Sequence, residues 1–155
     1  MRLARALLPL LLIAVPATKA EAQLVYVSGQ QTLAFGGVMR GIPKHILPSN
    51  PIMSGKFEFQ AVIGNRVRIR FTLPNRLNGP AGATMPVSFS TTDAMLQGQG
   101  PSSPPPVTFN PRARYTFTLA GSNTFNVWIG GTVTPGAAQA MGAYSNTISM
   151  TVTVL

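Results

Sequence analysis

The carboxyl-terminal stretch alternates between bulky and hydroxyl side chains from Tyr144 onward. Successive side chains of an extended strand point to opposite faces, so this period of two predicts a β-strand with one apolar and one polar face. Its β-branched residues also fit a strand better than a helix. Such a strand needs an apolar sheet face to cover, so we expect the rest of the chain to form that sheet. The bulky set is Tyr144, Ile148, Met150, Val152 and Val154, and the hydroxyl set is Ser145, Thr147, Ser149, Thr151 and Thr153.

Shorter runs earlier in the chain are also typical of strands, with glycine- and proline-rich turns between them. No convincing helix follows residue 22. Seven to eight short strands predict an all-β fold, an immunoglobulin-like antiparallel β-sandwich. The segments 41–54 and 74–86 contain several prolines or glycines and are interpreted as irregular connections. The expected strands lie within residues 24–35, 56–63, 66–73, 86–91, 107–109, 114–119, 124–133 and 144–154.

The two most regular runs lie on either side of Gly64. If they form one hairpin with a three-residue loop, Phe59 lies opposite Phe71 and Glu58 lies opposite Arg70, which is a favourable cross-strand pair. A sandwich can also place the two runs in different sheets. The sequence leaves both arrangements open.

The amino terminus resembles a secretory signal peptide. Two arginines precede an apolar run over residues 6–15, and small residues then lead to a cleavage site after Ala22, with Ala20 as the second choice. The apolar run is shorter than the roughly 20 residues that cross a bilayer. We therefore expect a signal peptide over 1–22 and a single β-sandwich domain over 23–155, exported to the periplasm, the cell surface or the medium, with no later transmembrane segment.

The chain carries few groups suited to acid–base chemistry. It has one histidine, three acidic residues and no cysteine among 155 residues, with a formal net charge of +9. After residue 22 these reduce to His45, Glu58 and Asp93. A Ser-His-Asp arrangement would need an unmarked serine, and a carboxylate pair would need Glu58, which is expected in mid-strand. We therefore expect no enzyme, no cofactor and no metal site.

Arg66, Arg68 and Arg70 fall on one face of a predicted strand, spaced by about 6.7 Å. They are candidates for binding a polyanion such as an acidic polysaccharide. No aromatic side chain is interleaved for base stacking, so we expect no specific nucleic-acid partner. The alternative is a solvated face that prevents edge-to-edge aggregation. Trp128 lies opposite the expected core face, where it either marks a ligand surface or is covered by a loop such as residues 97–106.

Six motifs follow one another across nearly the whole chain after residue 22. They are Leu33-Ala34-Phe35-Gly36, Gly55-Lys56-Phe57-Glu58-Phe59, Arg68-Ile69-Arg70-Phe71-Thr72-Leu73-Pro74, Met85-Pro86-Val87-Ser88-Phe89, Val127-Trp128-Ile129-Gly130-Gly131-Thr132-Val133 and Gly142-Ala143-Tyr144-Ser145-Asn146-Thr147-Ile148. In this order they resemble a bacterial exported family, the domain-of-unknown-function family 4402. The resemblance implies an exported β-sandwich and supplies no catalytic residues.

The ending, with Gly142 fourteenth from the carboxyl end, is also similar to spore coat protein U domains and to chaperone–usher pilins. That similarity implies a structural subunit that assembles by strand donation, with a related subunit or a periplasmic chaperone as partner. The alternatives are a self-contained sandwich whose amino-terminal segment is its own first strand, and a monomeric binding module for a polyanion. Candidate assembly residues are Val25, Val27, Leu33, Phe35, Gly142, Tyr144, Ile148, Met150, Val152 and Val154.

Overall fold

The computed structural model describes residues 25–155, so the predicted signal peptide lies outside the described residues. Within them every strand pair is antiparallel, and no helix is long and apolar enough to cross a bilayer. The elements are β1 (Tyr26–Gln31), β2 (Lys44–Ile46), β3 (Gly55–Gln60), β4 (Arg66–Thr72), β5 (Arg76–Asn78), the 3-10 helix η1 (Pro80–Gly82), β6 (Thr84–Ser88), β7 (Ala94–Gly98), β8 (Val107–Phe109), β9 (Tyr115–Thr118), β10 (Thr124–Ile129), β11 (Gly131–Val133) and β12 (Ser149–Val154).

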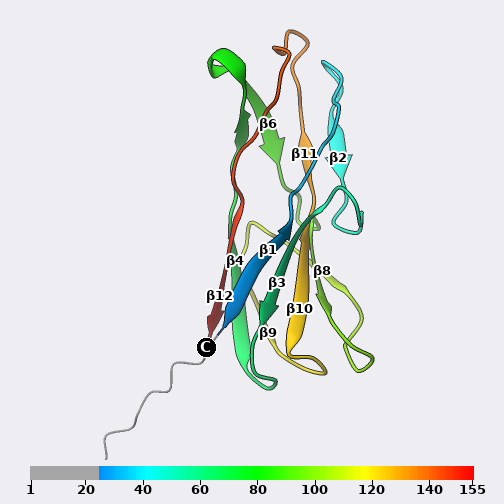
Figure 1. The fold of residues 1–155 in the computed structure, drawn as a ribbon, viewed down its shortest axis with the longest axis vertical. Helices are drawn as coiled ribbons and strands as arrows, with labels where there is room; N and C mark the ends of the chain where they lie inside the picture. The colour runs from blue at the N-terminus through cyan, green and yellow to red at the C-terminus, as the bar shows by residue number, and fades with distance from the viewer. Residues whose placement is uncertain (1–24) are drawn as a thin grey trace, which may run out of the picture.

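These strands form three sheets along an elongated molecule (Figure 1). A five-stranded sheet has the order β1-β3-β10-β7-β8, a three-stranded sheet has the order β12-β4-β9, and a four-stranded sheet has the order β2-β11-β6-β5. Gly130 is the single residue between β10 and β11, so the chain passes there from the five-stranded to the four-stranded sheet. The all-β, antiparallel prediction is confirmed, whereas the expected number of seven to eight strands is too low.

The core is built by aromatic side chains from the five-stranded and three-stranded sheets. Phe59 of β3 stacks on Phe125 of β10 with ring centroids 5.5 Å apart. Both rings meet the edge of Phe117 of β9, at 6.3 Å and 5.6 Å. Phe57 and Phe71, from β3 and β4, make a further edge contact at 5.8 Å. The two sheets therefore share one apolar interior, in a sandwich-like arrangement.

The hairpin across Gly64 is wrong, and the two-sheet alternative is right. β3 pairs with β1 and β10, whereas β4 pairs with β12 and β9. Glu58 lies opposite Ser28 and Asn126, and its carboxylate accepts a hydrogen bond from the side-chain amide of Gln99 at 3.0 Å rather than pairing with Arg70. Alternation determines which face of a strand is buried, but it does not identify the neighbouring strands.

Residues 144–154 have the predicted apolar and polar faces, but the part that pairs as a strand is shorter than predicted. Ladder pairing with β4 covers β12 only, and the backbone of residues 142–148 makes one isolated bridge, between Ser145 and Asn78. The Asn146 side-chain amide also donates to the Arg76 carbonyl at 2.8 Å. The bulky set is half-buried and packs against the core, whereas the hydroxyl set is exposed. Three short strands also lie where irregular chain or no strand was expected. They are β2, β5 and β7.

Candidate functional site

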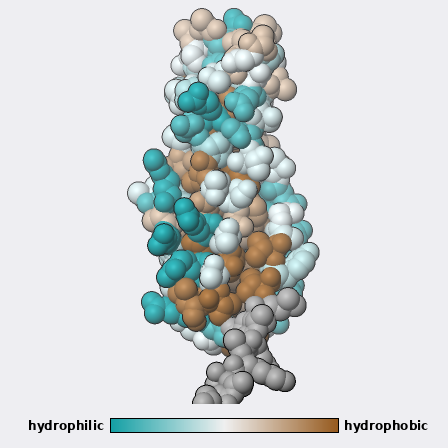
Figure 2. All heavy atoms as spheres, turned by 90° about the vertical axis from the view of Figure 1, so that its left-hand side faces the viewer, coloured by the Kyte–Doolittle hydropathy of each residue, from teal (hydrophilic) through white to brown (hydrophobic). Residues whose placement is uncertain are grey.

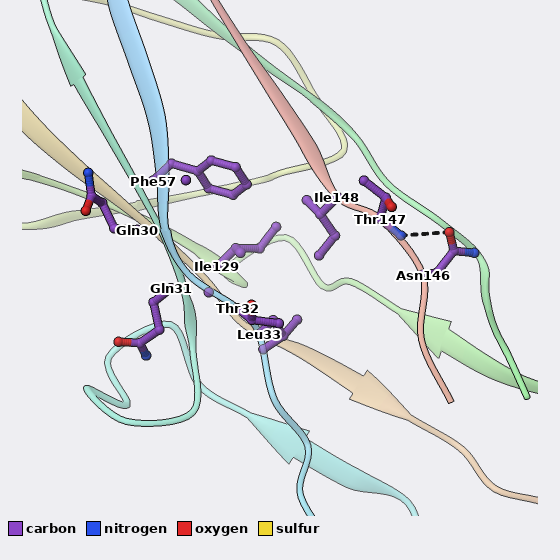
Figure 3. A pocket seen from close by; sticks show the side chains of 11 residues that line it. Gln30, Gln31, Thr32, Leu33, Phe57, Ile129, Asn146, Thr147 and Ile148 are labelled. Carbon is purple, nitrogen blue, oxygen red and sulfur yellow. Dashed lines mark hydrogen bonds between the residues drawn. The ribbon is translucent and has the colours of Figure 1, made fainter. Parts of the chain in front are cut away.

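A groove runs between the segment that follows β1 and the segment that precedes β12 (Figure 3). One hollow, of about 390 Å³, is lined by residues 29–33 and 146–148 and reaches Phe57 and Ile129. A second hollow, of about 370 Å³, is lined by residues 32–36 and 142–146. Because they share wall residues such as Leu33, the two hollows form one feature, which we call the edge groove.

Each wall of the edge groove is held by backbone hydrogen bonds on its outer side. On one wall the Ala34 N–H donates to the Met53 carbonyl at 2.8 Å. On the other, the Ser145 N–H donates to the Asn78 carbonyl at 2.9 Å, and the reverse bond is 2.8 Å. Among residues 25–155, no strand pairing joins the two walls. Two strand-like edges therefore face one another without pairing.

The floor of the edge groove is part of the protein's own apolar interior. The second hollow is lined by Met85, Val87, Phe89 and Val133, all of which are buried core residues. In Figure 3 the side chains of Phe57, Ile129 and Ile148 point into the first hollow, while Gln30 and Gln31 point away from it. The arrangement suits an extended segment that presents an apolar side chain at every second position.

The structure places the predicted assembly residues on both sides of this groove. Leu33 and Phe35 form one wall, and Gly142, Tyr144 and Ile148 form the other. The remaining members lie in or beside β1 and on the inner face of β12. Of the ten predicted assembly residues, all except Gly142 are half-buried against the core. The amino-terminal segment therefore acts here as the protein's own first strand. These remaining members are Val25, Val27, Met150, Val152 and Val154.

The backbone conformation of the groove wall and the space beside it require a glycine at position 142. Its φ is +137°, a conformation that L side chains rarely adopt. A Cβ placed there would also lie 2.8 Å from Pro80 Cγ. Gly142 was singled out from the sequence alone, and its backbone conformation supplies a physical reason for a glycine there.

Arg66, Arg68 and Arg70 lie on β4, which is the middle strand of the three-stranded sheet. Arg66 and Arg70 are exposed, and Arg68 is half-buried. Figure 2 shows hydrophilic side chains in a column beside hydrophobic ones on this side of the molecule. Because the intervening Val67 and Ile69 are buried, the three arginines share the opposite face of the strand, as the sequence predicted, and none of them lines the edge groove.

His45 and Asp93 are brought together although 48 residues separate them. Nε2 of His45 lies 2.9 Å from Oδ1 of Asp93, whose side chain is 1% exposed, while that of His45 is 42% exposed. Oδ2 accepts a hydrogen bond from the Ser90 backbone N–H at 2.7 Å, and the Asp93 carbonyl accepts one from Gly130 at 2.8 Å. This pair therefore joins β2 to the turn before β7.

A Ser-His-Asp site would need a serine hydroxyl on the other side of the imidazole, and no hydrogen bond between His45 and a serine is present among the described residues. Glu58, the other carboxylate after residue 22, bonds to Gln99 instead. Within residues 25–155 no group of three histidine, cysteine or acidic side chains is arranged to hold a metal ion. The His45–Asp93 pair is best explained as a structural link.

We expect Asp93→Ala to lower the free energy of unfolding by about 2 kcal/mol, because the half-buried Ser90 N–H loses its acceptor and His45 loses its partner. Urea unfolding followed by circular dichroism would measure the change. His45→Ala is the comparison, and we expect it to cost less because the histidine is largely solvated. Equal stability of Asp93→Ala and the wild type would contradict the structural role.

Trp128 lies on the outer face of the five-stranded sheet, opposite Lys56 and Met95 on its neighbours. The Lys56 ammonium lies 5.0 Å from the ring centroid, which is within the range of a cation–π contact. The indole N–H is buried and has no hydrogen-bond partner within the described chain. The Lys56 side chain thus covers part of the ring, and the stacking surface left for a ligand is reduced.

The fold and its surfaces therefore define an all-β, antiparallel protein with an open groove between two strand edges. In comparisons with known proteins, no family model, no curated protein and no solved structure matches the chain.

Proposed function

We propose that this protein is a non-catalytic, exported structural or surface subunit with an immunoglobulin-like, pilin-like sandwich, and that copies assemble by exchanging their amino-terminal strands. The observation that carries the proposal is the edge groove, because one of its walls is the amino-terminal segment itself, which pairs with the rest of the fold on one side only. If that segment leaves, the opening onto the core can be filled by the same segment of another copy. An unpaired edge offers backbone donors and acceptors in a row, which is the surface that strand addition uses. The order of the six motifs and the pilin-like ending are the sequence features that led to the same expectation.

The proposed occupant is residues 25–36 of a second copy. In the closed subunit this segment is an edge element: β1 pairs with β3 on one side only, and its register is interrupted between Gly29 and Gln31. It carries apolar side chains that already fit the adjoining core. Exchange of an identical element between copies reproduces these contacts in a neighbour, so it needs no new complementary surface. Before assembly, a periplasmic chaperone is the proposed partner of the same edges.

Disulfide trapping between copies tests the exchange directly, because the natural chain has no cysteine. Ser28 of β1 lies opposite Glu58 of β3. Separately purified Ser28→Cys and Glu58→Cys proteins, both beginning at residue 23, would be mixed and oxidised. If strands exchange, position 28 of one copy meets position 58 of another at a spacing that a disulfide can bridge. We expect a covalent dimer on a non-reducing gel, with a yield that rises with protein concentration.

The matched control pairs Ser28→Cys with Ser88→Cys, since Ser88 also lies on a strand and is more exposed than the half-buried Glu58, but belongs to β6 in another sheet. Random collision would link both mixtures equally, whereas exchange links only the first. Size-exclusion chromatography with light scattering on the unmodified protein is the second measurement. A monomer at every concentration, together with equal cross-linking in the two mixtures, would reject strand exchange.

A further inference from the structure

The outer surface of the three-stranded sheet is a continuous face of arginine and hydroxyl side chains, which we call the arginine–hydroxyl face. Arg68 lies opposite Thr153 on one side and Thr116 on the other. Arg70 lies opposite Thr151 on β12, and Arg66 lies opposite Thr118 on β9. Arg68 is thus bordered by hydroxyl groups on both sides, and Arg66 and Arg70 are each bordered by one. On its other side Arg66 lies beside Leu155, whose N–H donates to the Arg66 carbonyl at 2.8 Å. The members are Arg66, Arg68, Arg70, Thr72, Thr116, Thr118, Ser149, Thr151 and Thr153.

Protection of a free edge does not account for these charges. Charged side chains on strands commonly prevent edge-to-edge pairing, but that function belongs to an edge strand. β4 is the central strand, with β12 on one side and β9 on the other. Its arginines therefore do not protect an edge strand from pairing. Three like charges in one row, at a spacing of about 6.7 Å, also repel one another.

No carboxylate of the described chain neutralises this row. The one ion pair within residues 25–155 joins His45 to Asp93, and the Glu58 carboxylate bonds to Gln99 on the five-stranded sheet. The whole chain carries a formal net charge of +9, which attracts anions over a distance of about a Debye length. The guanidinium groups are therefore available to anionic groups from outside the protein.

We propose that the arginine–hydroxyl face binds a linear acidic polysaccharide lying along β4. Guanidinium groups bind carboxylate and sulfate groups through paired N–H donors, which gives both strength and orientation. The bordering threonine and serine hydroxyls both donate and accept hydrogen bonds, as the hydroxyls of a sugar require. This binding site is separate from the edge groove and does not depend on strand exchange.

The composition of the face argues against other polyanions. Single-stranded nucleic acids are held by aromatic side chains that stack on bases, and the face contains none. Peripheral attachment to a membrane uses several apolar side chains that enter the lipid beside the basic ones. Here a single exposed leucine, Leu155, borders the arginine, threonine and serine side chains of the face. A chain of hydroxyl-rich sugar units with regularly placed negative charges matches both components of the face.

Binding of the protein beginning at residue 23 to polygalacturonate and to heparin, measured by calorimetry at several salt concentrations, tests the proposal. We expect Arg68→Ser/Arg70→Ser to raise the Kd about tenfold and to make its salt dependence shallower, since two charge contacts are lost. Arg68→Lys/Arg70→Lys keeps the charge but loses the paired donors, so we expect a smaller increase, of about threefold. Circular dichroism confirms that each variant is folded.

Arg40→Ser/Arg112→Ser is the matched control, because it removes the same charge from exposed residues outside the face. We expect its Kd to stay within about twofold of the wild type. If Arg68→Ser/Arg70→Ser and Arg40→Ser/Arg112→Ser lost affinity equally, binding would depend on net charge alone, and the proposal would be overturned. Wild-type affinity in Arg68→Ser/Arg70→Ser would overturn it as well. Anionic vesicles and a single-stranded oligonucleotide are run in parallel. Binding of either one, but of neither polysaccharide, would also overturn it.

Discussion

Phe59→Ala is expected to lower the free energy of unfolding by about 3–5 kcal/mol, a large share of the roughly 5–15 kcal/mol that holds a typical domain. The ring is fully buried between the two sheets, stacked on Phe125 and against the edge of Phe117. Its removal leaves a cavity that rigid strands on both sides cannot close. No disulfide compensates, since the chain has no cysteine. Urea unfolding followed by circular dichroism measures the loss.

Val62→Ala is the control for this substitution. Val62 follows β3 by two residues but is 62% exposed, so its truncation should change stability by less than about 0.5 kcal/mol. Phe59→Leu, which keeps much of the volume, should fall between the two. If Phe59→Ala were no more costly than Val62→Ala, the two sheets would not share the aromatic interior described above.

Gly130→Ala is expected to cost about 3 kcal/mol, or to detach β2 from β11, because one methyl group has no space there. A Cβ at this position would lie 2.1 Å from the Ile46 carbonyl oxygen and 2.9 Å from the Pro48 nitrogen. Both are backbone atoms and cannot rotate away as a side chain would. Thermal unfolding measures the loss, and the fluorescence of Trp128, the only tryptophan, reports on the region two residues away.

Gly136→Ala is the matched glycine control. A Cβ at Gly136 would meet nothing within 4 Å, and its φ is not in the positive region. We therefore expect a change of less than about 0.5 kcal/mol. Wild-type stability in Gly130→Ala would mean that β2 does not approach the junction of β10 and β11 as closely as described. It would also argue against the structural role given to the contact between His45 and Asp93.

The groove could be predicted only in part. The apolar alternation around Tyr144 followed from the period of two, and Gly142 was singled out from the sequence as an assembly residue; both lie in the groove wall. Where the paired ladder of β12 begins was not predictable, because residues 144–148 follow the same alternation as residues 149–154 except at Asn146. Pairing there depends on which strand lies alongside, and β4 ends at Thr72 opposite Ser149.

The His45–Asp93 pair illustrates a second limit. The sequence identified both residues as scarce titratable groups, but only the fold brings them to 2.9 Å. Their contact depends on β2 pairing with β11 and on the turn before β7, and neither short strand has enough residues for a periodic signal. The arginine row was visible in the sequence, whereas its central position in a sheet was not.

Alternation at a period of two is a local property of the chain, so the amino-acid order was enough to predict the all-β class and the buried face of each long strand. Which strands are neighbours became known only from the fold, as the separation of Glu58 from Arg70 shows. The same is true of the edges that stay unpaired and the charges that lack a partner. Strand pairing joins residues far apart in the chain, and many pairings bury the same apolar faces equally well, so no local pattern can select one of them.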